Sequence, residues 1–169
     1  MPFWDTSAVV PLCVHQPITP AMRRIIAGDP RVVVWWGTPV EIQSALGRLA
    51  REGTLSQPAA VQAANRLATL RKAWHEILPS EKVRSLAEVL PTRHRVTAAD
   101  AFQLAAALIW CGERPRARPF VCLDRNLAVT AQEVGFTVVG PSPPAPPVQA
   151  AVENGGYSSR SSPAYTCTR

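Results

Sequence analysis

The sequence predicts an α/β fold with a mostly parallel central sheet flanked by helices. Short β-rich runs alternate with longer segments of helical periodicity, an alternation that is typical of parallel sheets built through crossover connections. The run 31–36 is apolar without polar alternation, as expected for a strand that is buried on both faces. The length of 169 residues suits a single domain of ordinary size with a core of its own.

The first half of the chain is expected to hold two strands and four helices. In chain order these are a strand, two helices, a strand and a helical hairpin: residues 2–5, 7–14, 19–27, 31–36, 39–52 and 58–77. In the first helix of the hairpin, Ile42, Leu46 and Leu49 recur at helical spacing. Gly53 stops that helix, because glycine readily adopts the backbone conformation that ends a helix.

The second half continues the alternation. Residues 81–90 form either a helix alone or a helix preceded by a short strand near 77–78. An apolar helix, a strand, a helix and a last strand follow: residues 98–110, 119–123, 126–134 and 136–139. The composition then changes at Gly140 to a Pro/Ser/Gly-rich segment. We therefore predict a folded domain over 1–140 and a disordered tail over 141–169, because proline fixes the backbone and removes hydrogen-bond donors.

Composition excludes several classes of protein. The longest apolar run falls well short of the roughly 20 residues of a membrane span, and the first residues lack the basic region of a signal peptide, so a cytoplasmic protein without membrane contact is expected. Cysteines and histidines are isolated, which disfavours a zinc site. No glycine-rich phosphate loop is present. The net charge of +6 comes almost entirely from arginine and favours an anionic partner.

Four carboxylates occupy equivalent points of this predicted map. Asp5 and Asp124 each end a strand, while Glu41 and Asp100 lie in the first turns of helices. The carboxyl ends of parallel strands and the helices that follow them share one edge of a sheet, where ligands bind. Carboxylates that converge there repel one another unless a cation joins them, and hard oxygen ligands suit Mg²⁺ or Mn²⁺.

Helix capping is the alternative explanation for these acids. Thr38 with Glu41 and Thr97 with Asp100 both have the spacing of a capping box, in which a hydroxyl and a carboxylate satisfy the free N–H groups of a helix start. Asp5 and Asp124 fit simple N-caps, each worth about 1 kcal/mol. The fourth aspartate, Asp29, lies between Gly28 and Pro30 and is interpreted as a turn residue.

The motifs around these acids resemble those of PIN domains, most closely the VapC-type toxins of bacterial type II toxin–antitoxin systems. They appear in order over about residues 2–139, beginning at Phe3-Trp4-Asp5-Thr6-Ser7 and Pro39-Val40-Glu41-Ile42. They continue at Ala98-Ala99-Asp100-Ala101-Phe102-Gln103 and Leu123-Asp124-Arg125-Asn126-Leu127. The resemblance implies a PIN-like three-layer fold and a metal-dependent endoribonuclease that hydrolyses RNA phosphodiester bonds.

The resemblance also implies the roles of individual residues. Asp5, Asp100 and Asp124 would bind Mg²⁺ or Mn²⁺, and Glu41 would complete the catalytic set. Thr6, Ser7 and Asn126 would support the site, although an amide at Asn126 puts a second metal ion in doubt. The implied partners are an RNA substrate, a cognate antitoxin whose C-terminal segment crosses the acidic cleft, and a second copy of the chain in a homodimer.

Arginines near the acidic segments are candidates for contacts with RNA phosphates, because a guanidinium binds phosphate in a bidentate manner. They are Arg48, Arg51, Arg93, Arg95 and Arg125. Of Trp35 and Trp36 at the end of the second strand, one is expected in the core and the other at a base or a protein partner.

Other functions remain as alternatives. The chain could be a PIN-domain nuclease of housekeeping RNA processing, or a PIN-like binding module without catalysis. A haloacid-dehalogenase-like phosphatase is disfavoured, because such enzymes expect Asp-x-Asp where this chain has Asp5-Thr6-Ser7. A receiver domain is disfavoured because neither Lys72 nor Lys82 ends a late strand.

Overall fold

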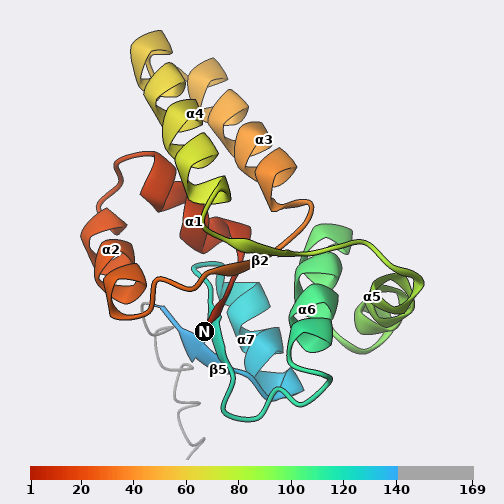
Figure 1. The fold of residues 1–169 in the computed structure, drawn as a ribbon. Helices are drawn as coiled ribbons and strands as arrows, with labels where there is room; N and C mark the ends of the chain where they lie inside the picture. Colours follow the sequence, from red (N-terminus) through yellow and green to blue (C-terminus); the bar gives the residue numbers. More distant parts are fainter. Residues whose placement is uncertain (141–169) are drawn as a thin grey trace, which may run out of the picture.

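The computed structural model describes residues 1–140, and the predicted tail over 141–169 lies outside the described residues. Residues 1–140 form a five-stranded sheet between two layers of helices, in which every strand pair is parallel (Figure 1). The order across the sheet is β3-β2-β1-β4-β5. The strands are β1 (Phe3–Trp4), β2 (Val33–Trp35), β3 (His75–Ile77), β4 (Pro119–Val121) and β5 (Thr137–Val139). The predicted α/β class is confirmed.

The helices divide between the two faces of the sheet. One face is covered by α1 (Thr6–Cys13), α2 (Thr19–Gly28), α3 (Thr38–Arg51) and α4 (Gln57–Arg71). The other is covered by α5 (Glu81–Arg93), α6 (Ala98–Trp110) and α7 (Arg125–Val134). Figure 1 shows α3 and α4 side by side as the predicted hairpin, which projects away from the sheet. No helix within residues 1–140 is both long and apolar enough to span a bilayer.

Neighbouring residues of each strand supply the two halves of the core, because successive side chains of a strand point to opposite faces. Phe3 lies in the core under α5, α6 and α7, where it stacks on Phe120 with ring centroids 5.6 Å apart. Trp4 and Val121 lie in the core on the opposite face. Apolar strands without alternation are therefore buried on both sides, as their sequence indicated.

The strand order creates a switch point between β1 and β4. From β1 the chain moves outward through β2 and β3, and β4 and β5 are then added on the other side of β1. The helix after β1 covers one face of the sheet, whereas the helix after β4 covers the other. Ligands of open α/β sheets bind in the crevice that such diverging connections leave at the carboxyl ends of the strands.

The predicted helix over 58–77 is wrong at its C-terminal end. Helix α4 stops at Arg71, and residues His75–Ile77 form strand β3, which is paired with the whole of β2. Trp74 is buried between them, and its indole N–H donates to the carboxylate of Glu76 at 3.0 Å. The pairing supplies hydrogen bonds that one side of β2 would otherwise lack, and this outweighs the helical pattern of the segment.

Helix α5 is longer than the predicted 81–90. It begins at Glu81 after the N-cap Ser80 and continues to Arg93, past Pro91. A proline inside a helix removes one backbone hydrogen bond but does not end the helix when packing holds it. Here Val83, Ala87 and Leu90 are buried, and α5 packs along α6.

Two glycines at helix ends provide a test of the backbone geometry. Gly135 caps α7 with φ of 113°, and an added Cβ would lie 3.3 Å from the ring of Pro115. We expect Gly135→Ala to lower the free energy of unfolding by about 1–2 kcal/mol, because an L side chain is strained at positive φ. Gly28, the last residue of α2, has no atom within 4 Å of an added Cβ. Gly28→Ala should change stability by less than about 1 kcal/mol. Urea unfolding measures the stability of both variants. Equal losses of unfolding free energy would contradict the assignment of a positive φ to Gly135.

Candidate functional site

Asp5 is a nearly buried carboxylate at the carboxyl end of the central strand β1. It is 4% exposed and forms the N-cap of α1, with Oδ2 accepting from the backbone N–H of Ser7 at 2.9 Å and from the Ser7 hydroxyl. Burial raises the pKa of Asp5 to about 6, the hydrogen bonds from Ser7 oppose that rise, and the nearby charges of Glu41 and Asp100 add to it. The site thus holds a carboxylate whose charged form is destabilised by burial.

The hydroxyl of Ser7 joins the two sides of the switch point. It donates to Asp5 after β1 and accepts from the backbone N–H groups of Leu123 and Asp124 after β4, at 2.9 and 3.2 Å. The Asp5 backbone N–H in turn donates to the carbonyl of Val121 at 2.9 Å. Asp5 and Asp124 are thereby held at the same edge of the sheet, as the sequence predicted.

Glu41 reaches the same edge from the first turn of α3. Its Oε2 accepts from the hydroxyl of Thr6 at 2.6 Å and from the side-chain amide of Gln103 at 2.9 Å. The predicted supporting residue Thr6 therefore holds Glu41, whereas Ser7 holds Asp5. Two adjacent hydroxyls at the start of α1 orient two different carboxylates.

Gln103 is a residue of this site that the sequence analysis did not single out. It is 1% exposed in the middle of α6, and its Nε2 lies 2.8 Å from the hydroxyl of Thr6 and 3.3 Å from that of the buried Thr38. The amide nitrogen must face this cluster, because the Thr6 hydroxyl already donates its proton to Glu41 and the carboxylate can only accept. Its Oε1 is buried and has no partner among the described residues. A single amide in an otherwise apolar helix was the available signal.

Asp100 and Asp124 act as helix caps in this structure. Asp100 closes a capping box with Thr97, accepting on Oδ2 from the Thr97 backbone N–H at 3.0 Å and from its hydroxyl at 2.8 Å. Asp124 accepts on Oδ1 from the backbone N–H of Leu127 at 2.9 Å. The capping interpretation is thus confirmed for both residues. For Glu41 it is not, because Gly37 is the N-cap of α3 and Glu41 binds side chains instead.

The four carboxylates share one pattern of hydrogen bonding. Each uses a single oxygen toward the protein, and its second oxygen has no hydrogen-bond partner among residues 1–140. None of them forms an ion pair with a basic group of the described chain. Asp29 differs, because it pairs with Arg31 at 2.8 Å and with the N-terminal amine at 2.7 Å. Capping alone leaves the free oxygens of the site without a cation.

Carboxylate oxygens are chemically suited to a hard cation such as Mg²⁺. The spacing of the four carboxylates, however, limits how many of them can bind one ion. Within residues 1–140, no three His, Cys, Asp or Glu side chains are grouped so that they could hold one metal ion. Mg²⁺ does not need such a group, since it keeps several waters and binds through one or two carboxylates together with substrate phosphates. Asp5 and its charged neighbour Glu41 each keep one carboxylate oxygen free of hydrogen bonds among residues 1–140.

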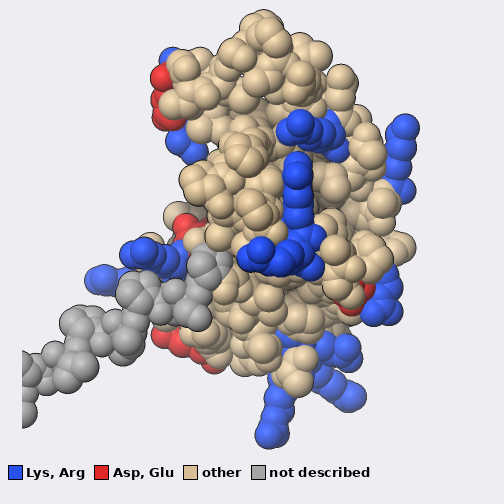
Figure 2. All heavy atoms as spheres, turned by 90° about the vertical axis from the view of Figure 1, so that its left-hand side faces the viewer, with Lys and Arg blue, Asp and Glu red and all other residues tan. Residues whose placement is uncertain are grey.

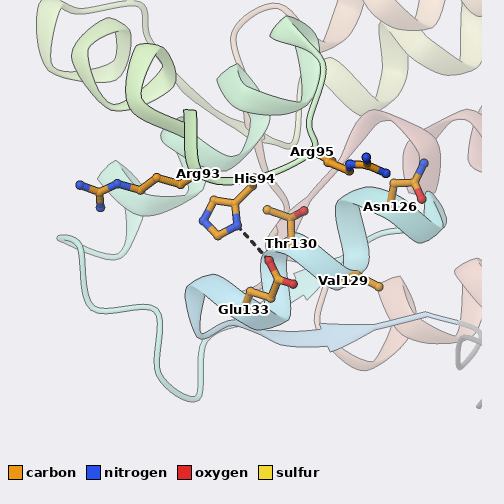
Figure 3. Close-up of a pocket in the computed structure, with 7 residues that line it drawn as sticks. All are labelled: Arg93, His94, Arg95, Asn126, Val129, Thr130 and Glu133. Atoms are coloured by element: carbon orange, nitrogen blue, oxygen red, sulfur yellow. Dashed lines mark hydrogen bonds and ion pairs between the residues drawn. The ribbon is translucent and has the colours of Figure 1, made fainter. Parts of the chain in front are cut away.

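The remaining predicted residues are spread over the surface, and Arg48 and Arg51 lie in the last turn of α3, at the opposite end of that helix from Glu41. Asn126 is exposed in the first turn of α7, where it lines a cavity together with Arg93 and Arg95 (Figure 3). Arg125 and Arg51 are exposed, and Arg48 pairs with Glu52 at 3.3 Å. Lys and Arg side chains are also spread over the face on which α2 lies (Figure 2). Positive charge is thus widely distributed, so charge alone does not locate an RNA path.

The two tryptophans at the end of β2 and directly after it separate as expected. Trp35 is 8% exposed and stacks on Phe102 of α6 with ring centroids 5.7 Å apart. Trp36 is 50% exposed. One therefore belongs to the core and the other presents half of its surface to solvent.

Cys122 is a buried thiol beside the site. Its sulfur lies 3.7 Å from Oδ2 of Asp5, and burial, followed by the charge of Asp5, raises its pKa. A thiol with a raised pKa remains protonated and is a poor nucleophile or metal ligand.

Comparison with known proteins informs the fold. No family model and no curated protein sequence matches this chain. Among solved structures, the crystal structure of PAE2754 from Pyrobaculum aerophilum is similar, with a TM-score of 0.57 and 18% identity over 80% of this chain and 87% of that chain. A similarity at this identity shows the fold alone, and it agrees with the three-layer α/β architecture.

The raised pKa of Asp5 predicts a pH dependence of stability. The contribution of Asp5 is fully present below its ordinary pKa near 3.8 and is lost as the pH rises through about 6. In EDTA, the wild type should lose about 3 kcal/mol of unfolding free energy between about pH 4 and about pH 7, relative to Asp5→Asn. Urea unfolding across this range measures the difference, and parallel curves for the two proteins would refute a buried, uncompensated carboxylate.

A second prediction concerns the amide of Gln103. Gln103→Leu removes the donor to Glu41 and Thr38, so we expect a loss of about 1–3 kcal/mol of unfolding free energy. The control is Gln43→Leu at an exposed position of α3, which should cost less than about 0.5 kcal/mol. Denaturant unfolding compares the two variants. Similar values would show that the buried network contributes little.

Proposed function

We propose that this chain is a metal-dependent endoribonuclease of the PIN type, which hydrolyses RNA phosphodiester bonds with carboxylate-bound Mg²⁺ or Mn²⁺. The observation that carries the proposal is the pattern of free oxygens: Asp5, Glu41, Asp100 and Asp124 each have one unused carboxylate oxygen and no basic partner within residues 1–140, and the buried Asp5 lies near the charges of Glu41 and Asp100. Burial destabilises the charged form of Asp5, and a cation is the ligand that would offset this cost.

The side chains around the acids support this role by holding them in place. Ser7 fixes Asp5 and the turn that carries Asp124, while Thr6 and Gln103 fix Glu41. Ligands whose other contacts are satisfied lose little freedom when they bind an ion. Asp5 and Glu41 would hold the ion, with Asp100 and Asp124 acting directly or through water.

The chemistry of hydrolysis then follows from general principles. A divalent ion activates water for attack and neutralises the charge that develops on the phosphoryl group. The carboxylates alone would repel a phosphodiester, so cleavage without a divalent ion should be negligible. Arginines around the edge would attract the RNA backbone, and no Cys or His nucleophile is required.

We further propose that the chain acts as the toxin of a toxin–antitoxin pair in the cytoplasm, inhibited by a cognate antitoxin and active as a homodimer. The motifs over residues 2–139 and their compact arrangement in one domain support this role. The gene neighbourhood tests this role. A small gene for a DNA-binding antitoxin next to this one would support the toxin, and a solitary gene would favour housekeeping RNA processing.

A non-catalytic binding module is the second candidate. The caps formed by Asp100 and Asp124, together with the missing three-ligand group in residues 1–140, favour it, because these acids then have a structural role. Cleavage assays separate the two candidates directly.

The test compares two Asp→Asn variants of the purified chain. Asp5→Asn should reduce Mg²⁺-dependent RNA cleavage by more than about 100-fold, because loss of a ligand exceeds the 10–100-fold typical of residues that only support one. Asp29→Asn is the matched control and should cleave normally, since Asp29 pairs with the N-terminal amine and Arg31. EDTA should abolish cleavage by the wild type.

Ligand-induced stability gives a readout that is independent of activity. Mg²⁺ should raise the Tm of the wild type and of Asp29→Asn, but not that of Asp5→Asn, because only a bound ion stabilises the folded state. Full Mg²⁺-dependent cleavage by Asp5→Asn would refute the proposal. Absence of both cleavage and a Tm shift in the wild type would favour the binding module.

A further inference from the structure

A cavity of about 460 Å³ lies between the end of α5 and the first half of α7, outside the carboxylate cluster (Figure 3). It is lined by Arg93, His94, Arg95, Asn126, Val129, Thr130 and Glu133. Its volume falls within the range of small-molecule sites, which is about 300–1,000 Å³. Such sites are usually mostly apolar, whereas the lining of this one is mostly polar and charged.

The cavity has two chemically different ends. In Figure 3 the guanidinium of Arg95 extends toward Asn126, while Arg93 points outward. Neither arginine has an ion-pair partner among residues 1–140. At the other end, Nδ1 of His94 lies 2.9 Å from Oε2 of Glu133, and Oε1 of Glu133 has no partner among the described residues. The first end suits an anion, and the second end offers an acceptor for N–H groups.

The cationic end lies next to the carboxylate cluster along both chain segments. Arg95 is two residues before Thr97, which caps α6 and binds Asp100. Asn126 is two residues after Asp124, which caps α7. Two extended residues span about 7 Å, so Arg95 and Asn126 are close in sequence and space to two of the four acids. The cationic end of the cavity is therefore a neighbour of the turns that carry Asp100 and Asp124.

We infer that this cavity binds one nucleotide of single-stranded RNA adjacent to the phosphate that is cut, an inference that rests on the proposed function. Arg95 and Asn126 contact the phosphate and ribose, because a guanidinium and an amide match their oxygens. Glu133, oriented by His94, accepts a hydrogen bond from the edge of the unstacked base. Val129 and Thr130 supply the wall against which the base packs.

The acceptor at Glu133 also selects among bases. A carboxylate accepts from the amino group of cytosine, and adenine and guanine carry amino groups as well. Uracil has no amino group, and its single exposed N–H lies between two carbonyl oxygens that a carboxylate repels. The pocket should therefore disfavour uracil.

The phosphate contact is tested by binding of fluorescent oligo(C) to the Asp5→Asn chain in Mg²⁺, which measures affinity without cleavage. Adding Arg95→Ala should weaken binding about tenfold and reduce the slope of log K against log salt by about 0.7, the value for one phosphate contact with a single strand. The matched control is Arg23→Ala, which removes an exposed arginine from α2 on the other face of the sheet. It should leave both quantities nearly unchanged.

The base contact is tested with oligo(C) and oligo(U) in the same assay. The parent should prefer oligo(C), and Glu133→Gln should reduce that preference about tenfold, because the amide offers a donor as well as an acceptor. An unchanged ratio would overturn the assignment of Glu133. Circular dichroism checks that the exposed substitutions leave the fold intact.

The outcomes separate this inference from the proposed function. If the wild type cleaves RNA but Arg95→Ala binds as tightly as Arg23→Ala, the subsite is overturned and the nuclease stands. If RNA is not cleaved but its binding depends on Arg95 and Glu133, the cavity is an RNA site and the nuclease proposal is overturned.

Discussion

The hydroxyl of Ser7 is the contact on which the geometry of the carboxyl edge depends. It links the turn after β1 to the turn after β4, the two places where the chain leaves the sheet in opposite directions. Without it, the N–H groups of Leu123 and Asp124 would lose their acceptor and Asp5 would lose a donor, at a net cost of the order of 1 kcal/mol for each lost hydrogen bond. A single side chain thus positions Asp5, Leu123 and Asp124 together.

Around this contact, the site combines satisfied and unsatisfied oxygens. Hydrogen bonds from hydroxyls, an amide and backbone N–H groups hold each carboxylate by one oxygen. Those bonds fix orientation but do not neutralise charge, and the pKa of Asp5 rises to about 6 because burial outweighs them. Asp29, which has a guanidinium and an amine beside it, shows how the same side chain is compensated when its role is structural. The contrast separates a carboxylate that has no ion-pair partner among residues 1–140 from one that has two.

Most of the fold could be predicted because its local and long-range requirements agree. The runs at 31–36 and 119–123 lack alternation, and both became strands buried on two faces. The segment 72–77 was predicted as the end of a helix, with a short strand near 77–78 only as an alternative, because its helical pattern is local, whereas its strand pairing depends on β2, which lies some 40 residues earlier. Gln103 was missed for the same reason: one amide in an apolar helix has no evident role until Thr6, Thr38 and Glu41 are packed against it.

By itself, the sequence determined the alternation of strands and helices, the caps at Thr97 and Asp124, and the carboxylates that a parallel sheet must gather at one edge. These features follow from short-range periodicity and capping chemistry. Only the tertiary structure decided the strand order, the full burial of Asp5, the network around Glu41 and the cavity between α5 and α7. Each of these depends on which segments, distant along the chain, exclude water from one another, and local sequence patterns do not record that.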